Sequence, residues 1–510
     1  MSSFKILATS LFLAAGAIAS PVQSDGISLV PRQRCSGAIG TIYTGTACFN
    51  FSGDEIEVCA SSVTCRNTDD ITGTLGIGSI ELSSNACEIK IFSELDCGNP
   101  RRRVNMRTIW STLLLPSLLG GVQGAAVKVP RSEYSSKIEV IRNPNYPLDA
   151  VDKLEEATMP KVEAWLAKKV ATETNNNCTL ENAIVRREWS DLSEESRQEY
   201  VAAVMCLMKL PPTVDKERFP GALSRYDDFV AYHMTHAMQL HDNLHLFGAH
   251  KYYVWLFEKA LREECNYTGY QPYMNYDRYS EDPLNSPLLN GNASSLGGNG
   301  VLEPTYKGVS QPGRTPNIKS GGGGGCVTEG PFSDMVVSLG PTSMSTATGI
   351  AKNPRPDGTG SNPRCLRRDV NRNAAMGAKA DRAFHLINEN KEMDGFYNEL
   401  LGTPPPKNDP YPWDPGGDPF TSPGDPLFYF HHTALDRLWW IWQMQDPENR
   451  LNAVPSGNMS MPMHKNRRAD DPMDPMETMV DMEWLGPPIK LGETHDQLGG
   501  YDGAFCYVYV

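Results

Sequence analysis

The chain has 510 residues, of which 40% are hydrophobic and 21% charged, and its formal net charge at pH 7 is −14. This composition is typical of a globular protein that buries a core, and the length predicts roughly two to four domains. An acidic balance without a basic stripe argues against a nucleic-acid-binding surface.

Residues 1–20 have the pattern of a secretory signal peptide. Lys5 precedes an apolar run from Ile6 to Ala19, and Ala17-Ile18-Ala19 supplies the small residues of a cleavage site. The run is too short to span a bilayer, so we expect a secreted protein with no membrane anchor. Twelve cysteines fit an oxidising compartment. Five glycosylation sequons fit secretion as well: Asn50, Asn177, Asn266, Asn292 and Asn458.

Residues 106–126 repeat this signal-like pattern inside the chain. Arg107 leads into an apolar stretch that ends at Leu119, and small residues follow from Gly120 to Ala126. Arg101-Arg102-Arg103, just before, is a candidate processing site. Two interpretations stay open: a buried apolar helix, or a second signal peptide. We favour the hypothesis of a second signal, which means that two secreted proteins are joined here.

Residues 21–105 predict a small module stapled by disulfides. Two stretches, Ile56-Glu57-Val58 and Cys87 to Ile91, alternate in the manner of β-strands between Gly, Ser and Asn clusters. No pattern in this module resembles a catalytic site. Its six cysteines are Cys35, Cys48, Cys59, Cys65, Cys87 and Cys97, whose pairing the sequence does not define.

Residues 127–510 predict a larger, mainly α-helical domain. Ser193 is a good N-cap for a helix in which Tyr200, Val204 and Leu207 recur at helical spacing. Cys178 and Cys206 bracket this region and can pair. Residues 284–363 are rich in Gly, Ser, Pro and Asn, so they predict a long irregular excursion with little core, either near a functional site or disordered.

The densest chemical signal is a group of five histidines between residues 233 and 250: His233, His236, His241, His245 and His250. His250 is predicted to begin a helix with an inward face, so its imidazole should point into a core. That face continues through Tyr253, Val254, Phe257 and Leu261.

His432 has a similar setting near the end of the chain. Asp425 is a good N-cap, with Pro426 as the first helical residue. One helix face then contains His432, Leu435, Trp439 and Gln443. Buried imidazoles on two helices are typical of metal centres in helical bundles, and an all-nitrogen ligand set favours copper.

Two alternatives remain for the first histidine group: a three-histidine zinc site, and ordinary hydrogen-bonded histidines of the core or surface. For three isolated histidines, His385, His464 and His495, we expect a structural role.

At this point the sequence resembles a known family. The stretch from Tyr226-Asp227-Asp228-Phe229 to Asp277-Arg278 is similar to the first copper region of the tyrosinase and catechol oxidase family, especially its short fungal members. The stretch from Ser422-Pro423-Gly424-Asp425-Pro426 through His431-His432 to Trp442-Gln443 is similar to the end of the second copper region. The resemblance covers about residues 130–510. Smaller matches are Arg187-Glu188-Trp189-Ser190, Asn362-Pro363-Arg364-Cys365 and Cys506-Tyr507-Val508-Tyr509.

The resemblance implies a mainly α fold, in which a helical bundle holds a di-copper-type centre among long irregular loops. It also implies oxidation of small phenols or o-diphenols by O2. His233, His241 and His250 match the three ligands of the first copper, and His432 matches the third ligand of the second. It implies no catalytic residue beyond these ligands. Gln239 stands where some members have a cysteine cross-linked to a ligand histidine, so we expect no thioether.

The neighbours of the third ligand differ from the family pattern. That ligand is usually framed by Trp and Arg, whereas Ala249 and Lys251 flank His250 here. We expect weaker local packing around a ligand that is retained.

The second copper region departs from the family pattern. Its two other histidines should stand four residues apart before Asp414-Pro415-Gly416-Gly417-Asp418, but those places hold Pro404 and Asn408. Proline has no ligand atom, an amide is a poor copper ligand, and Pro404-Pro405-Pro406 breaks the helix that would align such a pair. One alternative is that His385, farther upstream, replaces a missing ligand of the second copper.

Two functions therefore compete at the sequence level. One is a working copper oxidase of phenols, in which the ligand set is completed in another way or residues 395–414 are misread. The other is a catalytically silent, secreted copper-binding protein of the same fold.

Overall fold

The structure is a computed structural model, and it describes residues 38–42, 47–51, 56–57, 89–90, 127–128, 138–172, 177–241, 243–306, 308–309, 318–345, 349–400, 418–456 and 474–510. The chain divides into two compact units, Met1–Val122 and Gln123–Val510. Four features predicted above lie outside the described residues: the signal at 1–20, the segment 106–126, the positions Pro404 and Asn408, and His464.

In the first unit, four short strands are described. β1 (Ala38–Ile42) pairs antiparallel with β2 (Ala47–Phe51), and β3 (Ile56–Glu57) pairs parallel with β4 (Ile89–Lys90). β3 and β4 lie where alternation predicted strands. Cys48 lies in β2, but the other five cysteines and all of the pairing lie outside what is described, so a disulfide-stapled module stays a prediction.

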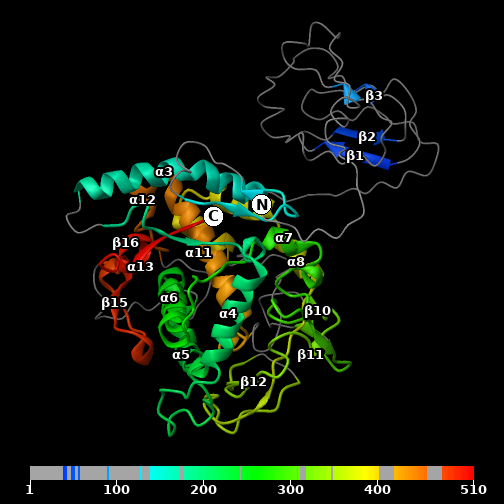
Figure 1. Cartoon of the computed structure of the whole chain (residues 1–510), viewed down its shortest axis with the longest axis vertical. Coiled ribbons are helices and arrows are strands. Elements are labelled where there is room, and N and C mark those ends of the chain that lie inside the picture. Colours follow the sequence, from blue (N-terminus) through cyan, green and yellow to red (C-terminus); the bar gives the residue numbers. More distant parts are fainter. Residues whose placement is uncertain are drawn as a thin grey trace. The chain divides into compact units, whose positions relative to one another are not determined.

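The second unit is built around four helices: α4 (Glu194–Leu207), α5 (Arg225–Leu240), α6 (Leu246–Cys265) and α11 (Leu427–Gln445). A long helix, α3 (Ala150–Thr172), packs against α11 and α9 (Ala380–Glu389). In Figure 1, α3 runs crosswise over the ends of the upright helices α4, α6 and α11. The predicted helical bundle is therefore confirmed.

The helix starts follow from local chemistry. The Ser193 hydroxyl accepts a hydrogen bond from the Ser196 amide, which confirms the predicted N-cap of α4. Ser224 and Asp227 form a capping box at the start of α5.

Two helices begin at other residues than predicted. α6 begins at Leu246, four residues before the predicted start at His250, and α11 begins at Leu427 rather than Pro426. The Asp425 carboxylate nevertheless caps α11 by accepting the Leu427 amide at 3.0 Å.

The region 284–363 has more core than its composition predicts. Leu288, Leu296 and Leu339 are fully buried, so the expectation of little core is wrong. The reason is close backbone packing: a Cβ on Gly300 would lie 2.1 Å from the Gly325 carbonyl oxygen. These glycines let strand β8 (Gly300–Leu302) approach β11 (Gly324–Val327).

The disulfides differ from the pair suggested by position. Cys206 bonds to Cys265, and Cys178 bonds to Cys506, so the pairing of Cys178 with Cys206 is wrong. Cys206 and Cys265 lie at the ends of the neighbouring helices α4 and α6. Cys506 belongs to β17 (Phe505–Tyr509), which pairs with β7 (Ile184–Arg186) near Cys178. A third disulfide, Cys326–Cys365, closes the irregular region.

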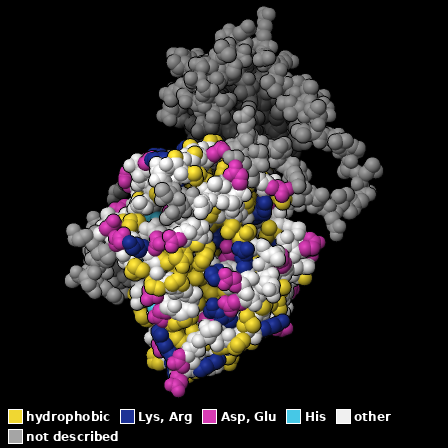
Figure 2. Space-filling view, turned by 60° about the vertical axis from the view of Figure 1, so that its left-hand side comes forward, with side chains coloured by type: hydrophobic (Ala, Val, Ile, Leu, Met, Phe, Trp, Pro, Cys, Tyr) yellow, Lys and Arg dark blue, Asp and Glu magenta, His cyan; other side chains and the backbone are white. Residues whose placement is uncertain are grey.

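Among the described helices, none is long and apolar enough to cross a membrane. On the face that Figure 2 draws, acidic and basic side chains are interspersed among hydrophobic ones, without a continuous field of one sign.

The remaining elements are short. They are β5 (Val127–Lys128), β6 (Ile141–Arg142), η4 (Trp189–Asp191), α7 (Tyr276–Ser280), η5 (Pro283–Asn285), β9 (Gly308–Val309), β10 (Ile318–Lys319), β12 (Val336–Val337), β13 (Arg364–Cys365), α8 (Arg372–Ala375), η6 (Met376–Ala378), α10 (Met393–Leu400), η7 (Ser422–Gly424), α12 (Pro447–Arg450), η9 (Pro475–Glu477), β14 (Met479–Val480), η10 (Glu483–Leu485), β15 (Ile489–Lys490), α13 (Leu491–His495) and β16 (Leu498–Gly500).

Candidate metal centre

Helices α5 and α6 bring three of the predicted histidines together. His233 lies on α5, His241 is the C-cap residue of α5, and His250 lies in the second turn of α6. One nitrogen from each ring falls within a group of atoms that all lie within 4.8 Å of one another. Within the described part of the chain, this is the only group of three or more His, Cys, Asp or Glu side chains with such geometry.

Backbone carbonyls fix the proton on each of these rings. The Nδ1 atom lies 3.0 Å from the Phe420 carbonyl oxygen in His233 and 2.7 Å from the Leu246 carbonyl oxygen in His250. In His241 it lies 2.8 Å from the Ala237 carbonyl oxygen. A carbonyl oxygen only accepts, so each Nδ1 carries the proton, and each neutral ring keeps a lone pair on Nε2. Nε2 is therefore the nitrogen that each ring can offer to a metal ion.

The spacing of these nitrogens fits one metal ion. The Nε2 atoms of His233 and His250 are 3.4 Å apart. Two nitrogens bound to one ion at about 2.0–2.1 Å lie about 3.3–3.4 Å from each other in tetrahedral geometry and about 3.5–3.6 Å in trigonal geometry. Two lone pairs facing each other at this distance repel, and a cation between them removes that repulsion.

Burial keeps the imidazoles in the neutral form that a metal needs. His233 and His250 are buried, and burial together with the neighbouring His241 lowers the pKa of both rings well below the usual value. Ligand histidines bind metals as neutral rings, so protons compete weakly at neutral pH. Imidazole nitrogens suit copper and zinc, and the donor set therefore fits copper.

His432 of α11 lies against this group. Its ring stacks on His250, with centroids 4.1 Å apart and planes 5° apart. Phe428, one turn earlier on α11, contacts the His432 ring at 4.2 Å and the His233 ring at 5.1 Å between centroids. Burial lowers the pKa of His432 well below the usual value. The structure thus places all four predicted site histidines in one cluster.

The neighbours of the ligand histidines are well packed, contrary to the weaker packing expected beside His250. Ala249 and Lys251 are both buried. The Lys251 ammonium lies 3.4 Å from Asp436 on α11 and 4.4 Å from the centre of the Trp439 ring. Asp436 also accepts the hydroxyls of Tyr507 and Tyr509 at 2.7 Å each. The last strand, β17, therefore bonds to Asp436 of α11, and Asp436 in turn contacts Lys251 of α6 beside the site.

Among the described residues, the histidines outside the cluster have other surroundings. His236 stacks on Tyr232 and lies 3.1 Å from Glu483, while His245 precedes α6. His385 lies on α9, where its Nδ1 is 2.8 Å from Glu399. The structure therefore gives no support to His385 as a substitute ligand.

Sequence patterns missed two polar partners of the cluster. The Phe420 carbonyl orients His233, and the Tyr276 hydroxyl lies 2.5 Å from Nδ1 of His431, the residue before His432. A backbone carbonyl has no residue-type signature. Tyr276 lies within the first resembling stretch, but its partner stands 155 residues later.

One buried histidine outside the cluster gives a testable pH dependence. Burial, aided by the charge of Lys251, lowers the pKa of His495 to about 3. In the unfolded chain this histidine takes up a proton near pH 6.5, whereas in the folded protein it does so only near pH 3. The contribution of neutral His495 to the free energy of unfolding is therefore present in full above pH 6.5 and is lost as the pH falls towards 3. For the metal-free protein, we expect His495→Gln to reduce the loss of unfolding free energy between pH 7 and pH 5 by about 2 kcal/mol.

Urea unfolding followed by tryptophan fluorescence at the two pH values measures this effect. His385→Gln is the matched control, because His385 is half-exposed. It should keep the pH dependence of the unmodified protein. An unchanged pH dependence in His495→Gln would contradict the expectation.

The fold and the site define a helical-bundle protein with a metal centre of imidazole ligands. Residues 223–445 match the family described as the common central domain of tyrosinase. The chain is 42% identical over 301 residues to the tyrosinase-like protein orsC of Emericella nidulans, which covers 57% of this chain and 81% of that protein. It is 34% identical over 341 residues to tyrosinase P of Aspergillus terreus, covering 64% and 92%.

A solved structure supports the same assignment. A polyphenol oxidase from Thermothelomyces thermophila, determined as a mutant, matches with a TM-score of 0.64 and 34% identity. The match covers 71% of this chain and 97% of that chain. The chain belongs to the tyrosinase family of type 3 copper proteins.

Proposed function

We propose that the chain is a secreted copper oxidase that uses O2 to oxidise phenols or o-diphenols, with His233, His241, His250 and His432 as metal ligands. The observation that carries the proposal is that His233, His241 and His250 each bring one ring nitrogen to a group of atoms within 4.8 Å of one another. Similar proteins named tyrosinase and polyphenol oxidase support a phenolic substrate.

The side chains of the site support this chemistry in defined ways. Copper, when bound, would carry electrons from the substrate to O2. Two o-diphenols each give two electrons and two protons, and one O2 takes all four of each to form two waters. The backbone carbonyls bound to Nδ1 hold the three imidazole rings in place, and the Phe428 ring packs against the rings of His233 and His432.

A second candidate function is a copper-binding protein without turnover. The observation that favours it is in the sequence: residues 401–417 contain no histidine, and Pro404 and Asn408 occupy the places of two second-site ligands. With His432 as its only ligand from that region, a second ion would be held weakly. One copper transfers one electron at a time, whereas each o-diphenol must lose two.

Metal content and turnover distinguish the two functions. Copper per chain would be measured by mass spectrometry of the metal on the full secreted protein, together with O2 uptake in the presence of catechol. Two copper ions with O2 uptake support the oxidase. One ion or none, without O2 uptake, would establish the silent protein and overturn the oxidase.

We also propose that the chain is secreted and glycosylated. Asn177, Asn266 and Asn292 are exposed in the structure, which leaves room for glycans. Mass spectrometry of the secreted product tests this proposal and the joined-protein hypothesis together. A peptide that spans residues 103–127 in the mature protein would overturn the second signal at 106–126.

A further inference from the structure

One buried carboxylate organises the loop whose carbonyl orients His233. Asp418 is fully buried. Its Oδ1 accepts the Phe420 amide at 3.1 Å, and its Oδ2 accepts the Thr421 hydroxyl at 2.9 Å. Its main-chain oxygen accepts the Ser422 amide at 2.9 Å. These bonds fold residues 418–424 into a tight turn in which the Phe420 carbonyl is directed at α5.

The same loop is held from two other sides. The Ser345 hydroxyl, from the irregular region, donates to Oδ2 of Asp418 at 2.8 Å. Gly340 packs so closely that a Cβ there would lie 2.5 Å from Thr421 Cγ2. The Tyr226 hydroxyl of α5 donates to the Pro423 carbonyl at 2.6 Å. The irregular region therefore buttresses a loop that contacts the metal centre.

Resting on the proposed function, we propose that Asp418 is a positioning residue of the metal centre. Through the Phe420 carbonyl it keeps the proton of His233 on Nδ1 and keeps the Nε2 lone pair directed at His250. Without this carbonyl, the ring is free to rotate or to carry its proton on Nε2, the atom that faces the metal. Either change removes one of three ligands.

The magnitude expected follows from known partners of metal-bound histidines. Loss of a group that orients a ligand histidine typically weakens metal affinity about 10–100-fold. Asp418→Ala removes both carboxylate oxygens that accept the Phe420 amide and the Thr421 and Ser345 hydroxyls. Asp418→Asn keeps one of these oxygens, and Ser345→Ala removes one donor. We expect copper affinity to fall about 10–100-fold in Asp418→Ala, and less in the other two variants.

A matched control separates positioning from general stability. Asp369 is also buried, and its carboxylate accepts the amides of Gly321 and Gly323 at 2.9 to 3.0 Å. Asp369→Ala should lower the melting temperature about as much as Asp418→Ala and leave copper affinity unchanged. Affinity would be measured on the full chain by competition for Cu(I) with a chromogenic chelator. Equal affinity in the unmodified protein and Asp418→Ala, or equal losses in both alanine variants, would overturn the proposal.

A second measurement is independent of copper. In the metal-free protein labelled with ¹⁵N-histidine, long-range ¹H–¹⁵N spectra report which ring nitrogen of His233 carries the proton. We expect Nδ1–H in the unmodified protein and in Asp369→Ala, and its loss in Asp418→Ala. The same tautomer in all three would overturn the positioning role. An unmodified protein that keeps Nδ1–H but takes up no copper would overturn the proposed function and leave the role of Asp418 supported.

Discussion

The His250→Ala variant is expected to lose the copper ion of the three-histidine site and, with it, all O2 uptake with catechol. His250 supplies one of three nitrogens that converge within 4.8 Å, and its ring also stacks on His432. Two imidazoles alone leave an incomplete ligand set. Because His250 is buried on α6, the variant also opens a small cavity, at a cost of about 1–3 kcal/mol. Metal analysis and circular dichroism of the same sample separate ligand loss from unfolding.

His236→Ala is the matched control for this variant. His236 lies on α5 one turn after His233, but its ring stacks on Tyr232 and its Nε2 contacts Glu483. Its two ring nitrogens contact the Tyr232 carbonyl oxygen and Glu483, so they are directed away from the three-histidine group. We expect this variant to keep its copper and its O2 uptake. Retention of copper in His250→Ala, or an equal loss in His236→Ala, would contradict the ligand assignment.

Much of this site was predictable because the positions of its histidines on helix faces follow from the residues next to them in the sequence. The apolar faces of α6 and α11 repeat with the period of a helix, so the sequence places His250 and His432 on inward faces. Trp439 and Gln443, which share the face of His432, are fully buried as predicted. Helix periodicity is the most reliable signal in a single sequence. The helical bundle and the convergence of four histidines follow from it together with the family resemblance.

The features that the sequence did not reveal depend on residues far apart in the chain. Cys178 and Cys506 are separated by 328 residues, and no spacing rule indicates that they pair. The core of the irregular region depends on glycines that allow backbones to touch, and composition alone describes such glycines as loop residues. Phe420 acts on His233 through a main-chain oxygen, which any residue type supplies. Long-range pairing and backbone contacts are therefore the parts that required a structure.

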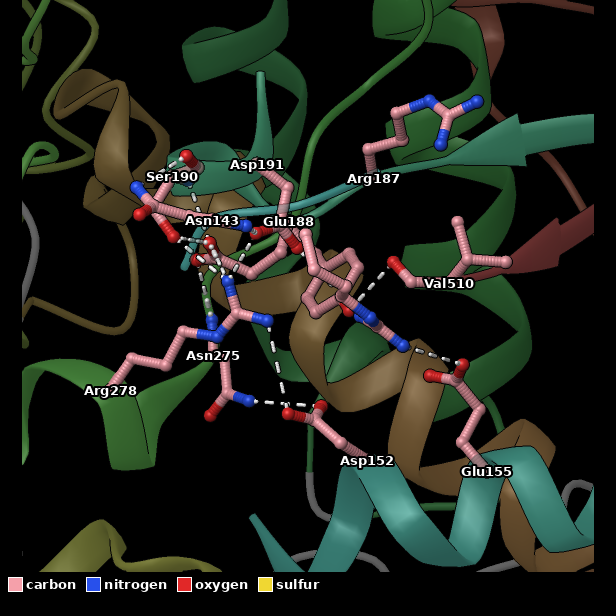
Figure 3. Close-up of polar contacts among 12 residues, drawn as sticks. Asn143, Asp152, Glu155, Arg187, Glu188, Ser190, Asp191, Asn275, Arg278 and Val510 are labelled. Carbon is pink, nitrogen blue, oxygen red and sulfur yellow. Dashed lines mark hydrogen bonds and ion pairs between the residues drawn. The ribbon is translucent and has the colours of Figure 1, made fainter. Parts of the chain in front are cut away.

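A group of buried charged side chains packed against α11 leads to a second prediction, on the stability of the protein. Figure 3 shows Arg278 of α7 directed at Glu188, Asp191 and Asp152, whereas the neighbouring Arg187 points away from them. Arg278 Nη1 donates to Glu188 at 3.0 Å and to Asp191 at 2.7 Å. Asp152 also accepts from Arg437, five residues after His432 on α11, at 2.7 Å. The group thus joins α3, α7 and the segment at Glu188 to the helix that carries His432.

Replacing Arg278 by methionine is expected to lower the free energy of unfolding by about 3–5 kcal/mol at pH 7, because the buried Glu188 then loses its positive partner. Asp152 keeps its ion pair with Arg437. Arg187→Met, a change of the same size at a half-buried side chain, should cost less than about 1 kcal/mol. Urea unfolding at pH 7 and pH 5 measures both.

The pH dependence of the deficit distinguishes lost charge pairing from lost packing. Burial already raises the pKa of Glu188, and removal of Arg278 raises it further. A carboxyl whose folded pKa lies above its unfolded value regains stability as pH falls through the folded pKa. The deficit of Arg278→Met relative to the unmodified protein should therefore narrow at pH 5. A deficit that is the same at both pH values would show that Arg278 stabilises the protein through the packing of its side chain and not through its ion pairs with the buried carboxylates.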